Sequence, residues 1–177
     1  MVRRRKKRFH TNNEVRIAAQ TLITSKTDLH GYITYCNDDF IHYSGYTEKE
    51  LFMQPHSIIR HPDMPRTVFK LLWDYVQNGR EIFAYVKNLS KSGSFYWVFA
   101  NITPSYDANN KIIGYYSVRR QPTAIGIQTA DGLYKEMLKI EETEGMEGSE
   151  AYLNNVLKSL KKSYNQVIYE LQYKGQP

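Results

Sequence analysis

The distribution of apolar and polar residues along this chain of 177 residues predicts two groups of β-strands with helices between them. An early hairpin is expected around Gly31, between the segments "TLITSKTD" and "GYITYCN". Three later strands are expected in "EIFAYVKNLS", "SFYWVFANITPSY" and "KIIGYYSVRRQP". The turns "KSGS" and "DANNK" connect them at hairpin spacing, which favours antiparallel pairing.

Helical spacing is clearest over residues 64–78. Asp63 stands where an N-cap is expected, and Pro65 falls in the first turn, where its missing N–H costs nothing. The apolar face comprises Val68, Leu72, Tyr75 and Val76, with Phe69 and Trp73 on its flank. Shorter helical pieces are expected at "NDDFIHYSGY" and "TEKELF", and another over residues 13–20.

The order of these elements predicts an α+β fold. Two strands, short helices, one longer helix and three strands fit a single five-stranded antiparallel sheet with the helices on one face, followed by C-terminal helices. We divide the chain into a basic tail with an N-terminal cap (1–20), a central domain (21–123), a helical extension (124–142), a Gly/Glu linker (143–149) and a heptad-patterned helix (150–173).

The last segment, residues 150–173, has apolar residues at alternating steps of four and three. They are Leu153, Leu157, Leu160, Tyr164, Val167 and Leu171. This is the heptad spacing of a coiled coil. It predicts a helix that pairs with a second copy in a homodimer or with a partner helix. The alternative is an amphipathic helix that packs against its own domain.

Positive charge is concentrated at the N-terminus. The formal net charge is +6, and residues 3–8 are "RRRKKR". Without them, 18 Lys and Arg residues balance 18 Asp and Glu residues, so no nucleic-acid-binding face is expected. The tail is expected to be a solvated arm, or to contact an anionic membrane surface or an acidic partner.

Several classes of protein are disfavoured by what the sequence lacks. No run of about 18 apolar residues is present, which disfavours a membrane span. Cys36 is the single cysteine, which rules out an internal disulfide and fits a reducing cytoplasm. The chain has no nucleophile elbow, metal-ligand spacing or phosphate-binding glycine loop, so we expect that it is not an enzyme.

Several segments together resemble the flavin-binding PAS domains of bacterial aerotaxis and energy-taxis receptors. They are "TLITSKTDLHGYITYCNDDF", "SGYTEKEL", "QPHSIIRHPDMP", "LLWDYVQNG", "VKNLSKSGSFYWVFANITP" and "GYYSVRRQPT", within residues 21–123. The resemblance implies a PAS fold with a pocket for FAD, whose redox state is reported to a signalling domain. One difference is Ile82, at a position where this subgroup usually has a tryptophan.

The resemblance also implies a signalling partner. The chain contains no receptor-type signalling domain, so we expect it to dock on a separate chemoreceptor-type signalling protein, which can itself be membrane-bound. A cytoplasmic location is expected, or a peripheral one at the inner face of the membrane through residues 3–8.

The segment "IIRHPDMP" (58–65) is the expected binding site for the phosphates of FAD. Arg60 can form forked, charge-assisted hydrogen bonds to the pyrophosphate, and His56 and His61 can add donors. Asp63 is expected to cap the following helix and to orient Arg60 more than to bind the cofactor. In the structural alternative, Arg60 pairs with Asp63 and His61 is a hydrogen-bonded loop residue.

Four further residues are candidates for the surroundings of the flavin ring. Asn88 offers a donor and an acceptor together, and the resemblance places a flavin contact at this position. Trp73 is either part of the core or an aromatic wall of the pocket. Tyr96 and Trp97 point to opposite faces of a strand, and the resemblance favours Tyr96. Asn37 either caps a short helix or reaches the cofactor.

Two alternatives to FAD remain from the sequence. One is haem b, with His42, His56 or His61 as the axial ligand. The other is a ligand-free PAS dimer that acts only as an adaptor, whose pocket would be filled by its own side chains, including Trp73.

Overall fold

The computed structural model describes residues 9–174, so the basic segment 3–8 and the predictions made for it lie outside the described residues. The elements are, in chain order, β1 (Ile23–Thr27), β2 (Ile33–Cys36), α1 (Asp38–Ser44), α2 (Glu48–Leu51), the 3-10 helix η1 (His56–Ile59), α3 (Arg66–Gln77), β3 (Ile82–Leu89), β4 (Phe95–Tyr106), β5 (Ile112–Arg120), α4 (Ala124–Thr143), α5 (Gly145–Leu160) and α6 (Tyr164–Tyr173).

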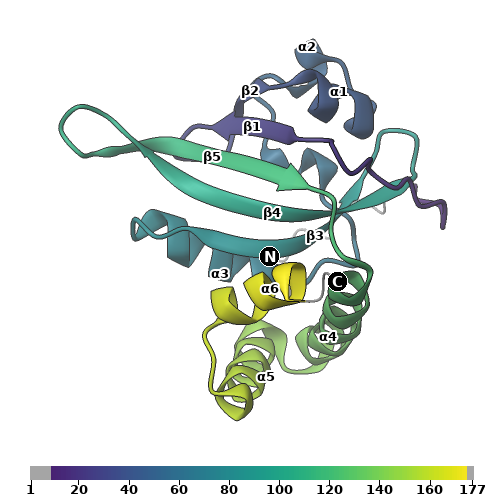
Figure 1. The fold of residues 1–177 in the computed structure, drawn as a ribbon, viewed down its shortest axis with the longest axis vertical. Coiled ribbons are helices and arrows are strands. Elements are labelled where there is room, and N and C mark those ends of the chain that lie inside the picture. The colour runs from purple at the N-terminus through teal and green to yellow at the C-terminus, as the bar shows by residue number, and fades with distance from the viewer. Residues whose placement is uncertain (1–8, 175–177) are drawn as a thin grey trace.

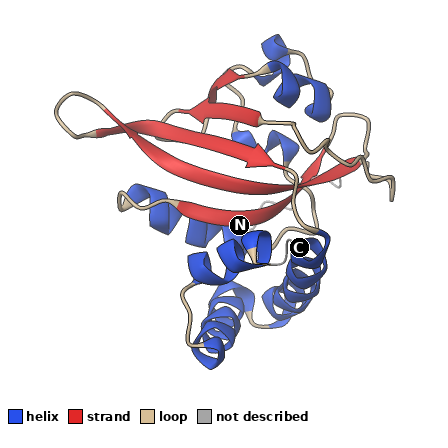
Figure 2. Cartoon of the chain, viewed as in Figure 1, coloured by secondary structure: helices blue, strands red, loops and turns tan. Residues whose placement is uncertain are grey.

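Strands β1 to β5 form one antiparallel sheet in the order β2-β1-β5-β4-β3 (Figure 1, Figure 2). The N-terminal hairpin thus joins the C-terminal one through the pairing of β1 with β5. Helices α1 and α2 lie near β2, and α4, α5 and α6 gather on the β3 side (Figure 1). The predicted α+β fold with a five-stranded antiparallel sheet and C-terminal helices is confirmed.

The two faces of the sheet are covered by different helices. Side chains alternate along a strand, so Val86 and Asn88 of β3 point to the α3 face, where both line a cavity. Tyr85, which directly precedes Val86, points to the opposite face and donates a hydrogen bond to Gln172 Oε1 of α6 at 2.9 Å. On the same opposite face, Trp97 of β4 stacks on Tyr134 of α4.

The edge strand β3 is protected by side chains of the C-terminal helices. The backbone N–H of Phe83 donates to Asn165 Oδ1 of α6 at 3.0 Å, and the carbonyl of Tyr85 accepts from the Tyr134 hydroxyl of α4 at 2.8 Å. An exposed edge would offer unpaired backbone groups to other chains, so these contacts satisfy groups that a sixth strand would otherwise pair.

The predicted continuous helix over residues 150–173, with its coiled coil, is wrong. Lys161 adopts a left-handed conformation with φ +52°, and Ser163 starts α6 with a capping box to Gln166. The apolar seam is therefore split between two helices that pack on their own domain, where Leu153 and Ile168 are buried. The predicted linker 143–149 is also wrong, because α4 extends to Thr143 and α5 begins at Gly145.

Two smaller predictions about helices are also corrected. Helix α3 begins at Arg66, and its N-cap is Pro65, which supplies no side-chain cap; Asp63 is not the cap. Residues 13–20 form no helix, because the backbone of Asn13 and Val15 instead bonds to Phe95 of β4, at 2.9 and 2.8 Å. Backbone pairing with an existing sheet outweighed a weak local preference for helix.

Among residues 9–174, no helix combines the length and the apolar character that a membrane span requires.

Candidate functional site

A cavity of about 310 Å³ lies between α3 and the inner face of the sheet. One wall is apolar and comes from α3, with Phe69, Leu72 and Trp73. Trp73 also packs edge-on against Tyr115 of β5, with ring centroids 5.4 Å apart. Trp73 therefore serves as an aromatic wall and leaves the cavity open.

The opposite side of the cavity is polar. It contains Ser25 from β1, His56 from η1, Asn88 from β3, and Ser117 and Arg119 from β5. The strand register brings them together: Ser25 pairs with Ser117 across β1 and β5, and the small Ala100 of β4 lies opposite Arg119.

Arg119 is the more deeply buried of the two arginines that line the cavity. It is only 4% exposed, and its Nη2 donates to His56 Nε2 at 2.7 Å and to Ser25 Oγ at 3.0 Å. No ion pair among residues 9–174 involves Arg119, and its Nη1 has no hydrogen-bond partner there. Burial lowers the pKa of Arg119 to about 10, so it stays charged near neutral pH.

His56 is held neutral beside Arg119. Removal from bulk water, followed by the nearby Arg119 charge, lowers the pKa of His56 to about 3. The imidazole can then accept the hydrogen bond from Arg119 with Nε2, but it cannot offset the positive charge. The cavity thus contains a cation without a protein anion among the described residues.

Two further polar groups in the cavity have no partner within residues 9–174. They are Asn88 Nδ2 and Ser117 Oγ, on residues that are 3% and 7% exposed. Buried polar groups are almost always hydrogen-bonded, because an unmade bond costs about 1–3 kcal/mol. Together with Arg119 Nη1, these groups form a set of donors that a polar, electron-rich ligand would satisfy.

Arg60 lines the cavity from segment 58–65, which we call the charged elbow. Its guanidinium lies 3.7 Å from the ring centroid of Phe69, and Nη2 donates to the Met64 carbonyl at 3.3 Å. Its backbone forms a bridge with Asn88 of β3. The elbow is therefore fixed to the strand that carries the candidate amide.

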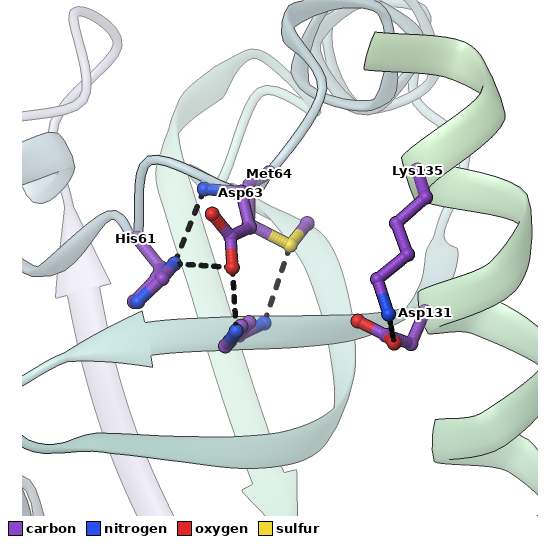
Figure 3. Close-up of polar contacts among 6 residues, drawn as sticks. His61, Asp63, Met64, Asp131 and Lys135 are labelled. Atoms are coloured by element: carbon purple, nitrogen blue, oxygen red, sulfur yellow. Dashed lines mark hydrogen bonds and ion pairs between the residues drawn. The ribbon is translucent and has the colours of Figure 1, made fainter. Parts of the chain in front are cut away.

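His61 and Asp63 lie outside the cavity lining. Figure 3 shows their side chains close together, with a dashed line joining them. Asp63 pairs with Lys87 Nζ of β3 at 2.6 Å, and its backbone N–H donates to His61 Nδ1 at 3.1 Å. Burial and the Lys87 charge lower the pKa of His61 to about 4. The pKa of Asp63 is lowered as well, since the hydrogen bond and charge of Lys87 outweigh its burial. The structure thus uses Asp63 to fasten the elbow to β3.

Tyr96 and Asn37 also lie outside the lining. Tyr96 is on the cavity face of the sheet, opposite Asn88, but it is buried against Tyr43, and burial raises its pKa. Asn37 is the N-cap of α1: its Oδ1 accepts from the Phe40 N–H at 3.1 Å.

Of the eight sequence-predicted site residues, the cavity brings together Arg60, His56, Asn88 and Trp73. Arg119, Ser117 and Ser25 were missed. The signal for two of them was present in "GYYSVRR", where Ser117 and Arg119 share the parity of the buried Tyr115. An arginine at an inward position of a strand is the sequence feature that indicates a buried cation in the cavity.

Residues 33–119 match the family model described as the PAS fold. The chain is 42% identical to the aerotaxis receptor of Escherichia coli (strain K12) over 129 residues, which is 73% of this chain and 25% of that receptor. The chain thus spans about a quarter of the length of this relative.

Solved structures show the same fold. The PAS domain of a protein from Colwellia psychrerythraea has a TM-score of 0.53 at 22% identity, covering 58% of this chain and 86% of that one. The LOV domain of the blue-light photoreceptor Aureochrome1, in its light state, has a TM-score of 0.55 at 14% identity, covering 65% and 91%.

Proposed function

Because residues 33–119 belong to the PAS family, we propose that this chain is a redox sensor that binds FAD in its cavity and relays the cofactor's redox state to a chemotaxis signalling partner. The similarity to an aerotaxis receptor supports a role in signal transduction. The flavin and the relay rest on the chemistry of the cavity.

The observation that carries the proposal is the set of unpartnered donors on the polar side of the cavity. Asn88 Nδ2, Ser117 Oγ and Arg119 Nη1 are buried and have no partner among residues 9–174. A flavin presents carbonyl oxygens and ring nitrogens along one edge and an apolar surface elsewhere. This matches a cavity with donors on one side and Phe69 and Trp73 on the other.

The volume of the cavity limits how much of FAD it can enclose. Ligand pockets span roughly 300–1,000 Å³, so about 310 Å³ is near the lower end. The cavity suits an aromatic ring system, and the adenine dinucleotide part would extend beyond it. Arg60, at the lining, is the residue we assign to the phosphates, since a guanidinium suits phosphate oxygens.

A bound flavin supplies reversible electron uptake, which adds negative charge to its ring. Arg119 would stabilise that charge, and His56 keeps the guanidinium oriented toward the cavity through the 2.7 Å hydrogen bond. Asn88 would respond to a changed hydrogen-bonding pattern on the ring and pass the change to β3. Coupling of this kind typically amounts to about 1–3 kcal/mol.

Haem b has less support from the histidines. His42 is exposed on α1, and His61 lies outside the cavity lining. His56 lines the cavity, but its Nε2 is already engaged by Arg119 and Ser25. A ligand-free adaptor has less support too, because Trp73 leaves the cavity open instead of filling it.

The partner in this proposal is a chemoreceptor-type signalling protein, and the chain acts in the cytoplasm as a binding module, without catalysis. A homodimer is not part of the proposal. It was predicted from the heptad pattern, and those apolar residues are divided between α5 and α6, which pack on the domain itself.

The test is the visible spectrum of the purified protein before and after dithionite, with the released cofactor identified by chromatography. We expect a yellow protein that bleaches and releases FAD, or takes up added FAD if it is purified without it. Arg119→Gln should weaken binding, whereas Arg120→Gln, an exposed neighbour of opposite parity, should not. A Soret band, or failure to bind added FAD, would overturn the proposal.

A further inference from the structure

Helix α3, which forms the apolar wall of the cavity, has no N-terminal cap of its own. Pro65 precedes it and offers no side-chain acceptor. A helix N-terminus leaves its first N–H groups unpaired and carries a partial positive charge, so an uncapped end is unfavourable. The cap of α3 comes from elsewhere in the chain.

Glu141 of α4 supplies that cap. Its Oε2 accepts from the Arg66 N–H at 3.1 Å, and its Oε1 accepts from the Thr67 N–H and the Thr67 hydroxyl, both at 2.7 Å. Thr67 is only 1% exposed, so the two bonds that it donates are partly shielded from water, whereas the bond from Arg66 is exposed. One carboxylate thus satisfies three donors at the start of a helix 74 residues away from it in the sequence.

The capped turn leads directly to the cavity wall. Phe69 lies two residues after Thr67, lines the cavity, and carries the guanidinium of Arg60 on its ring. Trp73 follows one helical turn later and also lines the cavity. A change in how α3 begins therefore moves the aromatic side chains that a ligand would contact.

The other side of α4 is fixed to the strand that forms the opposite wall. The Tyr134 hydroxyl donates to the carbonyl of Tyr85 at 2.8 Å, between the cavity-lining Val86 and the start of β3. Gly126 lies so close to the Tyr85 ring that an added Cβ would overlap it. Helix α4 thus bridges the two walls of the cavity from outside.

We propose that Glu141 is a positioning residue that ties α4 to helix α3, so that ligand binding in the cavity and the docking of α4 are coupled. The inference rests on the proposed flavin site and adds the route by which that site reaches the C-terminal helices. Glu141 lies beyond the matched residues 33–119, so the tether is contributed by the C-terminal extension of this chain. The coupling must be reciprocal: whatever moves α4 also changes ligand affinity.

The first experiment compares Glu141→Ala with Glu142→Ala in the full chain, using titration with FAD. Glu142 is its exposed neighbour on α4, and its side chain makes no hydrogen bond or ion pair among residues 9–174. Loss of an N-cap and its charge should weaken FAD binding about tenfold in Glu141→Ala. Glu142→Ala should bind within about twofold of the wild type, which controls for a change of net charge.

The second experiment separates tethering from simple capping. Pro65→Ser in the Glu141→Ala background provides a local cap for α3 without restoring the link to α4. The double variant should regain most of the affinity for FAD. Hydrogen exchange of residues 134–143 should slow on FAD binding in the wild type, but not in Glu141→Ala or in the double variant. If Glu141 only stabilised α3, the double variant would regain both the affinity for FAD and the exchange response of residues 134–143.

The outcomes distinguish this inference from the proposed function. If the wild type binds FAD but Glu141→Ala binds equally well, or if α4 still responds without Glu141, the inference is wrong and the flavin site stands. If the wild type binds no FAD, the proposed function fails. The link between Glu141 and α3 is then tested by the fluorescence emission of Trp73 in a Trp97→Phe background. The emission should shift in Glu141→Ala and not in Glu142→Ala. An unshifted spectrum in Glu141→Ala would overturn the inference.

Discussion

The charged elbow and the polar side of the cavity contain similar residue types, but their polar groups are used differently. In the elbow, Asp63 pairs with Lys87 at 2.6 Å and bonds to His61. In the cavity, Arg119 meets only neutral acceptors and retains a donor without a partner among the described residues.

The difference shows which of the two regions is prepared for a ligand. In the elbow, the opposite charges of Asp63 and Lys87 neutralise each other and link segment 58–65 to β3. A buried cation without an anion is destabilising until a ligand supplies electron density. His61 Nε2 is also unpartnered among residues 9–174, but its ring is kept neutral by a low pKa and therefore costs less.

The largest expected effect comes from removing the buried cation. In Arg119→Met, FAD affinity should fall about 100-fold, because charged hydrogen bonds are lost. The ligand-free protein should become more stable by about 1–3 kcal/mol, because an apolar side chain replaces an unpaired buried charge. FAD titration and chemical denaturation measure the two changes. A variant that lost both affinity and stability would mean that Arg119 is structural, like the elbow charges.

The next effect is a dependence of stability on pH. His56 has a pKa of about 3 in the folded state against about 6.5 when unfolded, so the unfolded state holds more protons between these values. The free energy of unfolding should thus fall as pH drops from 6.5, by roughly 1.4 kcal/mol per pH unit from His56. Denaturation of ligand-free His56→Gln between pH 6.5 and 4.5 should show a shallower slope than the wild type.

The same pH dependence of stability can be measured for His61, which lies in the elbow. The pKa of His61 is lowered to about 4. Its protonation therefore also lowers the free energy of unfolding as pH drops, but this effect ends at a higher pH than for His56. His61→Gln should also flatten the slope, but less than His56→Gln. Equal slopes in both variants and the wild type would contradict the claim that these rings are buried in the neutral form.

A smaller effect is expected from breaking the ion pair of the elbow. Asp63→Ala should lower the free energy of unfolding by about 0.5–1 kcal/mol, since the Asp63 side chain is 51% exposed and screened by solvent. FAD affinity should remain within about twofold, because Asp63 does not line the cavity. A loss of affinity comparable to that of Arg119→Met would restore the elbow as the binding site.

The smallest effect is expected at Ser117. Ser117→Ala removes an unpartnered hydroxyl, so the stability of the ligand-free protein should change by less than about 0.5 kcal/mol or rise. FAD affinity should fall by about threefold, the loss of one neutral hydrogen bond. A clear loss of stability would show that the hydroxyl has a partner within the protein.

The local patterns were sufficient for much of the fold. Alternation and turn residues predicted the β-strands. Local sequence signals also mark the two short helices: Gly45 ends α1, and the Thr47–Glu50 capping box begins α2. The capping box Ser163–Gln166 is an equally local signal, and it marks the start of α6 within the heptad pattern. Heptad spacing fits a helical hairpin as well as one long helix, so the capping box is the feature that distinguishes the two.

What the sequence determined by itself is the order and type of the elements from β1 to β5, and the parity that puts Ser117 and Arg119 on one face of β5. Only the tertiary structure decided which face encloses a cavity, that Asp63 turns to Lys87, and that Glu141 caps α3. Arg119 and His56 are 63 residues apart, and Glu141 and Thr67 are 74 apart. Such partners meet only when the sheet and the C-terminal helices are assembled, since local propensity carries no information about distant acceptors.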